Sequence, residues 1–196
     1  MMYRFRDILF SVLLLISLSW LFILIVILLA VTQRKVFFIQ ERTGYKERSF
    51  RLIKFSTLRD ALPGVPEEKD QKSRLTAAGK FLRKFSLDEM PQLINILKGE
   101  MSFVGPRPML HEYLPLYSAE QKKRFTVRPG ITGWAQVNGR NRISFTERFK
   151  LDVWYVEHRS LWLDLKIFLK SFAMIFSNQD VYANESTTME KFDGAN

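Results

Sequence analysis

Apolar residues are concentrated at the N-terminal end of this chain. Between Asp7 and Arg34 lies a run of 26 residues without a formal charge, ILFSVLLLISLSWLFILIVILLAVTQ. As a helix, a run of this length crosses about 30 Å of hydrocarbon. The apolar part of a secretory signal is shorter, about 7–15 residues, and ends in small residues before a cleavage site. The pattern therefore predicts a membrane-embedded helix over residues 1–35.

Basic side chains flank this apolar run on both sides: Arg4, Arg6, Arg34 and Lys35. Positive flanks favour the cytoplasmic face of a membrane, and a straight crossing places only one end there. A helix that enters, bends and returns places both ends on that face, provided that backbone groups freed at the bend find partners. The hydroxyls of Ser17 and Ser19 can bond back to carbonyls there. We predict a re-entrant helix, with a straight crossing as the alternative.

After residue 35 the pattern becomes that of a compact domain. Residues 36–40 and 50–55 favour β-strands and are separated by a turn that contains Gly44, which predicts a hairpin. Apolar spacing then predicts helices near 75–85, 88–97, 109–124, 145–157 and 161–176. We expect a mainly α fold with a small β-hairpin, made of a compact domain over 36–180 and a polar C-terminal tail over 181–196.

The last two predicted helices are rich in aromatic residues, including Trp154, Trp162, Phe168 and Phe172. Taken singly, each favours a core position. As a group beside a membrane segment, they also fit interfacial amphipathic helices, whose aromatic side chains lie at the level of the lipid headgroups. Both interpretations stay open.

The composition excludes several kinds of site. The chain has no cysteine, which excludes structural disulfides, thiolate zinc sites, iron–sulfur clusters and a cysteine nucleophile. Its formal net charge is +10, and almost all of this excess follows the apolar run. Beside a hydrophobic anchor, a basic domain favours anionic lipid headgroups or phosphate-bearing substrates. No nucleic-acid partner is expected, because zinc-finger spacing and the aromatic signature of RNA-binding modules are both absent from the sequence.

Two adjacent carboxylates, Asp88 and Glu89, lie in the sequence SLDEMP. Ser86 and Glu89 have the spacing of a capping box, so these residues can simply begin a helix. Pro91 fits poorly in a helix capped by Ser86 but is tolerated in the first turn of one capped by Asp88. Neighbouring carboxylates also suit magnesium-dependent phosphoryl transfer, with one as an oxygen ligand and the other as nucleophile. The spacing alone favours the structural role.

Arg107 stands between two prolines in MSFVGPRP, residues 101–108. Prolines restrict the backbone on both sides, and Gly105 permits a close approach of another segment. A guanidinium held in one direction suits bidentate recognition of a phosphate. The alternative is a rigid turn whose arginine pairs with an acidic neighbour.

Residues 128–141, RPGITGWAQVNGRN, form a glycine-rich loop that ends near Arg140. Such loops let backbone amides approach phosphates, although this spacing matches neither a Walker loop nor a dinucleotide fingerprint. A structural double turn is the alternative. Asp152 and Asp164 lie within amphipathic helices, where each is expected to be solvated or salt-bridged. The two histidines have no partner spacing and are left unassigned.

Taken in order, SLDEMPQLINILKGE, MSFVGPRP, RPGITGWAQVNGRN, LDVWYV and LDLKI resemble motifs of the bacterial sugar transferase family of monotopic phosphoglycosyl transferases. The resemblance covers residues 37–175. It implies one re-entrant membrane helix, a helical domain in the membrane interface at the cytoplasmic face of the bacterial inner membrane, and a catalytic Asp-Glu pair. The family usually has Ser-Pro at the bend of its membrane helix, whereas this chain has Ser19-Trp20. The bend must then come from the serines and from packing, or the segment is straighter than in relatives.

The resemblance also implies roles for single residues. Asp88 corresponds to the nucleophile that attacks the sugar-bearing phosphate of a UDP-sugar, releases UMP and holds a phosphosugar, which undecaprenyl phosphate then takes. Glu89 corresponds to the partner that helps to bind Mg²⁺, with Asp88 close enough to share the ion. The implied substrate-binding residues are Lys54, Arg83, Arg107, Asn138, Arg140 and Asp164.

The physical chemistry of these residue types agrees with the implied reaction. An aspartate with an ordinary pKa of about 3.9 is ionised at neutral pH and needs no general base to attack phosphorus. Its obstacle is repulsion from an anionic diphosphate. Mg²⁺ and fixed arginines counter that repulsion, which is the main contribution of a protein to phosphoryl transfer.

The donor sugar is the least determined part of this prediction. The short length, the segment YLPLYS and the ending TTMEKFDGAN are most similar to the small family members that initiate Campylobacter-type protein N-glycosylation. This similarity implies UDP-N,N′-diacetylbacillosamine or another N-acetylated amino sugar. An initiating hexose-1-phosphate transferase for exopolysaccharide or O-antigen is the alternative, and a non-catalytic membrane-surface module is the rival of another class. The oligomeric state stays open.

Overall fold

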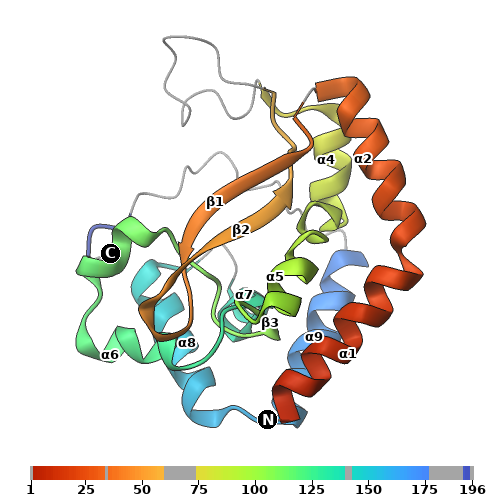
Figure 1. The fold of residues 1–196 in the computed structure, drawn as a ribbon. Helices are drawn as coiled ribbons and strands as arrows, with labels where there is room; N and C mark the ends of the chain where they lie inside the picture. The colour runs from red at the N-terminus through yellow and green to blue at the C-terminus, as the bar shows by residue number, and fades with distance from the viewer. Residues whose placement is uncertain (1, 34, 60–73, 140–142, 177–191, 195–196) are drawn as a thin grey trace.

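The computed structural model describes residues 2–33, 35–59, 74–139, 143–176 and 192–194. Within these ranges the chain is mainly helical, with two small sheets (Figure 1). Its elements are α1 (Met2–Ser17), α2 (Ser19–Gln33), β1 (Phe37–Thr43), η1 (Tyr45–Glu47), β2 (Ser49–Phe55), α4 (Ala77–Lys84), η2 (Leu87–Glu89), α5 (Gln92–Lys98), β3 (Ser102–Val104), η3 (His111–Leu116), α6 (Ala119–Lys122), η4 (Lys123–Thr126), β4 (Gly130–Thr132), α7 (Trp134–Asn138), α8 (Phe145–His158) and α9 (Leu161–Phe176). The predicted fold class is therefore confirmed in its balance of helix and strand.

The predicted hairpin is confirmed and is the larger of the two described sheets. Strands β1 and β2 are antiparallel, with Phe37 opposite Phe55 and Thr43 opposite Ser49. The second sheet was not predicted, because its strands β3 and β4 are three residues long and carry no periodicity. These two strands are parallel. They bring the proline-rich loop that follows β3 next to the glycine-rich segment that contains β4.

Most predicted helices lie where the pattern placed them, as α4, α5, α8 and α9. The single helix predicted over 109–124 is wrong. That stretch forms η3, α6 and η4 instead, because Pro115 lies inside η3 and Ser118 begins a new turn with a capping box. Helix α7 lies inside the glycine-rich loop and was not predicted.

The N-terminal apolar run forms two helices, and the chain bends by 64° between them, at Leu18. Ser17 Oγ donates to the carbonyl of Leu14 at 3.3 Å, and Ser19 Oγ donates to that of Ile16 at 2.9 Å, as the sequence predicted. Within the described residues, neither helix alone has the length and apolarity to cross a membrane, although the bent pair together does.

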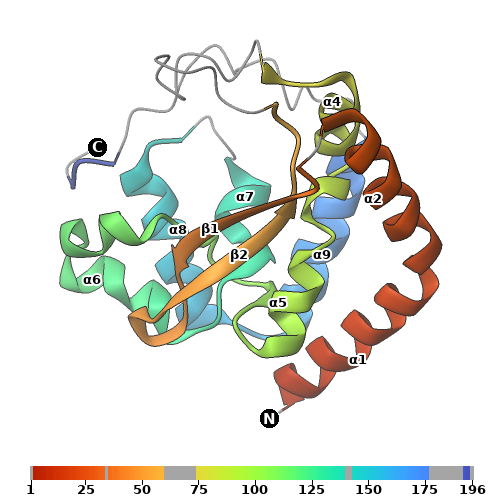
Figure 2. The ribbon, with the colours of Figure 1, turned by 45° about the horizontal axis from the view of Figure 1, so that its top comes forward.

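Helix α1 is attached to the rest of the molecule by its polar side. Asp7 and Ser11 face inward and are buried, and α1 packs along α5. Arg4 donates to the carbonyls of Ile96 and Leu97 in the last turn of α5, where free carbonyls and the helix dipole favour a cation. Helices α1 and α2 lie at one edge of the molecule (Figure 2). Many of their apolar side chains are exposed.

Helix α9 adds to this exposed apolar surface. Trp162 is 75% exposed, and Phe168 and Phe172 are exposed as well. Trp154 of α8 stacks with Trp134 and with His158 and is 38% exposed. For these four residues, the core interpretation is therefore wrong. The exposure of the three α9 residues places a row of large apolar side chains on the outside of the last helix.

The C-terminal end returns to the domain. Most of the predicted tail, 181–196, lies outside the described residues, but Phe192 is only 2% exposed. Its ring packs against Tyr117, Phe145 and Phe149. An aromatic side chain of the polar tail therefore completes a core cluster.

The hairpin and α5 are joined by one buried amide. Asn95 is fully buried, and its Nδ2 donates to the Arg51 carbonyl and to Glu100 Oε2, both at 2.7 Å. Its Oδ1 accepts from the Ile53 amide at 3.1 Å. These bonds fix β2 against α5 directly beside Lys54.

We predict that Asn95→Ala lowers the free energy of unfolding by about 2–4 kcal/mol, because it removes all three hydrogen bonds of a fully buried amide and leaves two backbone groups of β2 and the Glu100 carboxylate without this partner. Thermal or urea unfolding in detergent, followed by circular dichroism, measures this loss. The control is Asn138→Ala, which removes an exposed amide and should change stability by about 0.5 kcal/mol or less. Equal losses in the two variants would contradict the assigned role of Asn95.

Candidate active site

The adjacent carboxylates lie in η2, a single 3₁₀ turn between α4 and α5. Ser86, just before it, has a left-handed backbone with φ of 56°, and its side chain caps nothing. The prediction that Asp88 caps the following helix is wrong, because α5 begins later, at Gln92, with Pro91 in front of it. The turn leaves Asp88 only 9% exposed, with Glu89 beside it.

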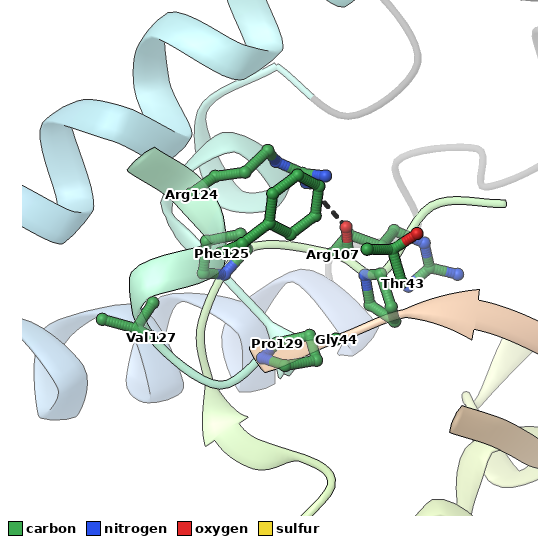
Figure 3. A pocket seen from close by; sticks show the side chains of 9 residues that line it. Thr43, Gly44, Arg107, Arg124, Phe125, Val127 and Pro129 are labelled. Atoms are coloured by element: carbon green, nitrogen blue, oxygen red, sulfur yellow. Dashed lines mark hydrogen bonds between the residues drawn. The ribbon is translucent and has the colours of Figure 1, made fainter. Parts of the chain in front are cut away.

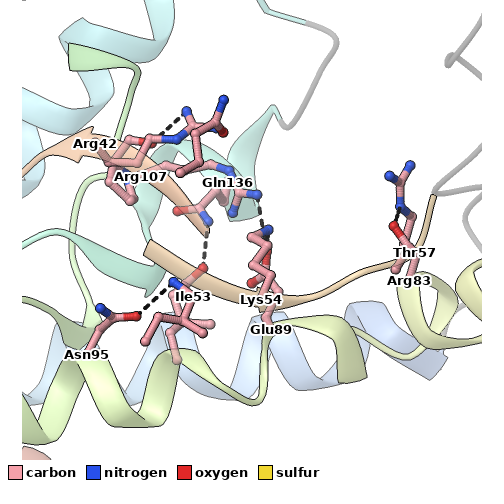
Figure 4. Close-up of polar contacts among 12 residues, drawn as sticks. Arg42, Ile53, Lys54, Thr57, Arg83, Glu89, Asn95, Arg107 and Gln136 are labelled. Carbon is pink, nitrogen blue, oxygen red and sulfur yellow. Dashed lines mark hydrogen bonds and ion pairs between the residues drawn. The ribbon is translucent and has the colours of Figure 1, made fainter. Parts of the chain in front are cut away.

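Glu89 is held by two cations. Lys54 Nζ, from β2, lies 2.6 Å from Glu89 Oε1, and Arg107 Nη2 lies 3.1 Å from the same oxygen (Figure 4). Burial alone would raise the pKa of this carboxyl, but the charges of Lys54 and Arg107 together with their hydrogen bonds lower it to about 2. Glu89 is therefore ionised over the whole physiological range.

Asp88 has the opposite environment. Among the described residues, no group forms a hydrogen bond or ion pair with its carboxylate. Burial raises its pKa, and the neighbouring charge of Glu89 raises it further, while Lys54, Arg83 and Arg107 act in the other direction. The site thus contains one neutralised carboxylate and one available for chemistry.

The cations around Asp88 come from three separate elements. Lys54 is the last residue but one of β2, and Arg107 follows β3. Arg83 lies on α4, where its Nε donates to Thr57 Oγ1 at 2.9 Å (Figure 4). Three of the predicted substrate-binding residues are therefore assembled around the predicted catalytic pair. A diphosphate placed here would meet positive charge from several directions.

Sequence reasoning missed Arg42. This residue lines a hollow with Lys54, Gln92 and Arg107, and its Nη2 donates to Gln40 Oε1 at 2.5 Å. Burial and the charge of Arg107 lower its pKa to about 10. The hairpin register places Arg42 opposite Phe50 and Lys54 opposite Phe38, so both lie on one face of the hairpin and line the same hollow. No spacing in the sequence indicates this.

The loop that carries Arg107 approaches the glycine-rich segment closely. A Cβ on Gly105 would lie 2.3 Å from the Arg128 carbonyl, so only glycine fits at this position. The same loop borders a second hollow, which is also lined by Thr43, Gly44, Arg124 and neighbouring residues (Figure 3). The predicted rigidity of this loop therefore has two sources, its prolines and its packing.

Three other predicted site residues are not brought to the carboxylates by described contacts. Asp164 is buried elsewhere, with Arg6 at 2.6 Å and the Tyr155 hydroxyl at 2.6 Å. Asn138 is exposed on α7 and accepts from Lys170 Nζ at 2.7 Å. Arg140 lies outside the described residues. The expectation that Asp152 and Asp164 are salt-bridged is confirmed for both.

The donor set fits magnesium only together with a substrate. Within the described residues, no group of three or more acidic or histidine side chains could hold a metal ion by itself. Mg²⁺ typically takes one or two carboxylates and completes its shell with waters and substrate phosphates. Asp88 and Glu89 supply two such oxygen donors.

Comparison with known proteins gives a consistent result. The family model described as bacterial sugar transferase matches residues 1–178. An uncharacterized sugar transferase of Bacillus subtilis, EpsL, is 46% identical over 160 residues, which cover 82% of this chain and 79% of that protein. An undecaprenyl-phosphate glucose phosphotransferase of Komagataeibacter xylinus is 39% identical over 194 residues, which cover 89% of this chain and 36% of the relative. An undecaprenyl-phosphate galactose phosphotransferase of Salmonella typhimurium is 40% identical over 147 residues, which cover 70% of this chain and 31% of that relative.

The pKa of Glu89 predicts a stability change in acid. Because the folded-state pKa is lowered from 4.5 to about 2, its ion pairs stabilise the fold above pH 4.5, and this contribution is lost as the pH falls through about 2. In metal-free buffer, the difference in unfolding free energy between wild type and Glu89→Gln should shrink over that window. Glu47→Gln, at an exposed ion pair, is the matched control and should show a much smaller change. A wild-type to Glu89→Gln difference that is constant with pH would contradict the ion-pair assignment.

Proposed function

Because this chain belongs to the bacterial sugar transferase family, and is accordingly a phosphoglycosyl transferase, we propose that it moves a sugar 1-phosphate from a UDP-sugar to undecaprenyl phosphate and releases UMP. The observation that carries the proposal is the unequal pair in η2. Glu89 is neutralised by Lys54 and Arg107, while the Asp88 carboxylate has no partner among the described residues.

In the first proposed step, an Asp88 carboxylate oxygen attacks the phosphorus that bears the sugar. The new oxygen–phosphorus bond forms as the bond to the UMP oxygen breaks, and the electron pair leaves with UMP. Asp88 then holds the sugar phosphate as an acyl phosphate. An aspartate needs no base for this attack when it is ionised.

In the second proposed step, an oxygen of undecaprenyl phosphate attacks the same phosphorus. The bond to Asp88 breaks, its electron pair returns to the carboxylate, and the lipid leaves as a diphosphate-linked sugar. Separating the steps allows one site to handle a soluble donor and a lipid acceptor in turn. It does not require both substrates to be bound together.

The cations make this attack electrostatically possible. Lys54 and Arg107 neutralise Glu89 and leave Asp88 facing positive charge rather than a second free carboxylate. A bound Mg²⁺, held by Asp88 and Glu89, would supply further neutralisation of the diphosphate. Fixed charges of this kind stabilise the developing negative charge without reorganising during the reaction.

The membrane placement is also part of the proposal. The bent pair α1 and α2 and the exposed aromatic side chains of α9 support a domain that lies on the cytoplasmic face of the inner membrane with a re-entrant anchor. This arrangement lets the basic site accept a lipid phosphate from the headgroup layer.

The identity of the donor has two lines of support that differ. The names of the two phosphotransferase relatives specify glucose and galactose, which favour a UDP-hexose. The resemblance carried by the short length, the segment YLPLYS and the ending TTMEKFDGAN favours a UDP-linked N-acetylated amino sugar instead. Both substrates carry the same uridine diphosphate, so the groups around Asp88 serve either one.

We predict that Asp88→Asn abolishes UMP release, because an amide cannot form the covalent phosphosugar. Purified protein in nanodiscs is incubated with undecaprenyl phosphate, Mg²⁺ and UDP-sugars that include glucose, galactose, N-acetylglucosamine and N,N′-diacetylbacillosamine, and UMP is measured. The donor that supports turnover in the wild type identifies the substrate.

Glu47→Gln provides the matched acidic control, because Glu47 lies 40% exposed in a surface ion pair, and its turnover should equal that of the wild type. Equal UMP release by wild type and Asp88→Asn would remove Asp88 from the mechanism. No UMP from wild type with any donor would favour a non-catalytic membrane-surface module.

The re-entrant anchor predicts that both ends of the chain lie on one side of the membrane. The chain has no native cysteine, so single cysteines at positions 2 and 188 can be labelled in sealed vesicles with an impermeant maleimide. Both should react from the same side. Labelling from opposite sides would establish a crossing helix instead.

A further inference from the structure

The peptide of Arg107 has a buried partner that the proposed reaction does not use. Arg124 Nη2 donates to the Arg107 carbonyl at 2.7 Å (Figure 3). The Arg107 side chain is 40% exposed, and within the described part of the chain its one ion pair is the 3.1 Å contact with Glu89. Its direction therefore depends strongly on how its backbone is held.

Arg124 is itself immobilised from several sides. Its side chain is 1% exposed, and Asp152 Oδ2 accepts from Nη2 at 2.7 Å and from Nε at 3.2 Å. Its Nη1 donates to the Tyr117 hydroxyl at 3.3 Å. A planar guanidinium can serve these partners and the Arg107 carbonyl at once, which a lysine ammonium cannot do with the same geometry.

Aromatic rings surround this ion pair. The Arg124 guanidinium carbon lies 4.9 Å from the centre of the Phe149 ring, and Phe192 packs on both Phe149 and Tyr117. Removing both charges from water costs free energy that offsets much of their mutual attraction. Well-packed apolar side chains of similar volume would therefore stabilise the fold about equally. The feature that apolar packing would not supply is a donor aimed at the Arg107 carbonyl.

The loop has other contacts on both sides of Arg107. On the C-terminal side, Arg42 Nη1 donates to the Pro108 carbonyl at 3.4 Å, and Thr43 N donates to the Met109 carbonyl at 3.0 Å. Neither of these contacts binds the Arg107 carbonyl.

On the N-terminal side, Gly105 N donates to the Thr132 carbonyl at 2.9 Å, and Gly130 N donates to the Pro106 carbonyl at 3.0 Å. The Tyr155 hydroxyl is 3.3 Å from the Val104 carbonyl but only 2.6 Å from Asp164 Oδ1. Its one hydrogen goes to the closer, charged acceptor, so Tyr155 adds little to the loop.

We propose that Arg124, held by Asp152, is a positioning residue for the transfer reaction: it fixes the Arg107 peptide and thereby aims the Arg107 guanidinium at the donor diphosphate. The inference rests on the proposed function and adds a residue that does not touch the substrate. Arg124 acts only through Arg107, which separates this role from a purely structural one.

A double-mutant cycle tests this dependence. Arg124→Lys keeps the charge beside Asp152 but loses the bond to the Arg107 carbonyl, and it should lower kcat/KM for the donor by roughly 10- to 100-fold. In an Arg107→Lys background, the same substitution should cost about twofold or less, because the side chain that it aims is no longer present. UMP release with the donor found in the panel provides the measurement.

Equal fold losses in the two backgrounds would overturn the inference while leaving the proposed function intact. Absence of UMP from the wild type with every donor would overturn the proposed function and this inference with it. Phe145→Leu, in the same aromatic cluster, is the matched core control, and its effect should be the same in both backgrounds.

A milder variant covers the case in which Arg124→Lys does not fold. Tyr117→Phe removes one anchor of the Arg124 guanidinium and keeps the packed ring. It should lower kcat/KM by a smaller factor than Arg124→Lys, and only when Arg107 is present. A loss that is the same with Arg107→Lys would count against the positioning role.

Discussion

Two carboxylates side by side in a desolvated turn repel each other, and the site is organised around that repulsion. Lys54 and Arg107 both bind the same oxygen of Glu89, which leaves Asp88 as the carboxylate without a partner among the described residues. The pair therefore has two different environments within one 3₁₀ turn. An unequal pair of this kind can combine charge neutralisation with nucleophilic attack, which two equivalent carboxylates could not do.

This inequality depends on segments that are far apart in the chain. Lys54 reaches Glu89 because Asn95 ties β2 to α5, the helix that follows η2. Arg107 reaches it because the parallel pairing of β3 and β4 fixes the start of its loop, and Arg124 holds its carbonyl. Hydrogen bonds to the backbone thus set the positions of the charged groups, rather than contacts among the charges alone.

The N-terminal helices are built into the same framework. Arg4 binds the last carbonyls of α5, and Arg6 pairs with Asp164 of α9 at 2.6 Å. The first of these contacts lies at one end of α5, and η2 with its two carboxylates lies just before the other end. An apolar outer surface and a basic site are consequently held at a fixed separation, which suits a reaction between a soluble donor and a lipid phosphate.

Sequence alone determined the features that depend on neighbouring residues: the bent apolar segment with its serine hydrogen bonds, the hairpin and most helices. It also contained the motifs around Asp88, Glu89 and Arg107 that assign the chain to its family. It did not determine the three-residue parallel sheet, the broken stretch over 109–124 or the partners of each charge. A charged residue in a helix has the same local pattern whether it faces solvent or, like Asp152, a buried arginine. Only the tertiary structure decided which carboxylate is neutralised, because Coulomb energy depends on distances between segments that the chain brings together by packing.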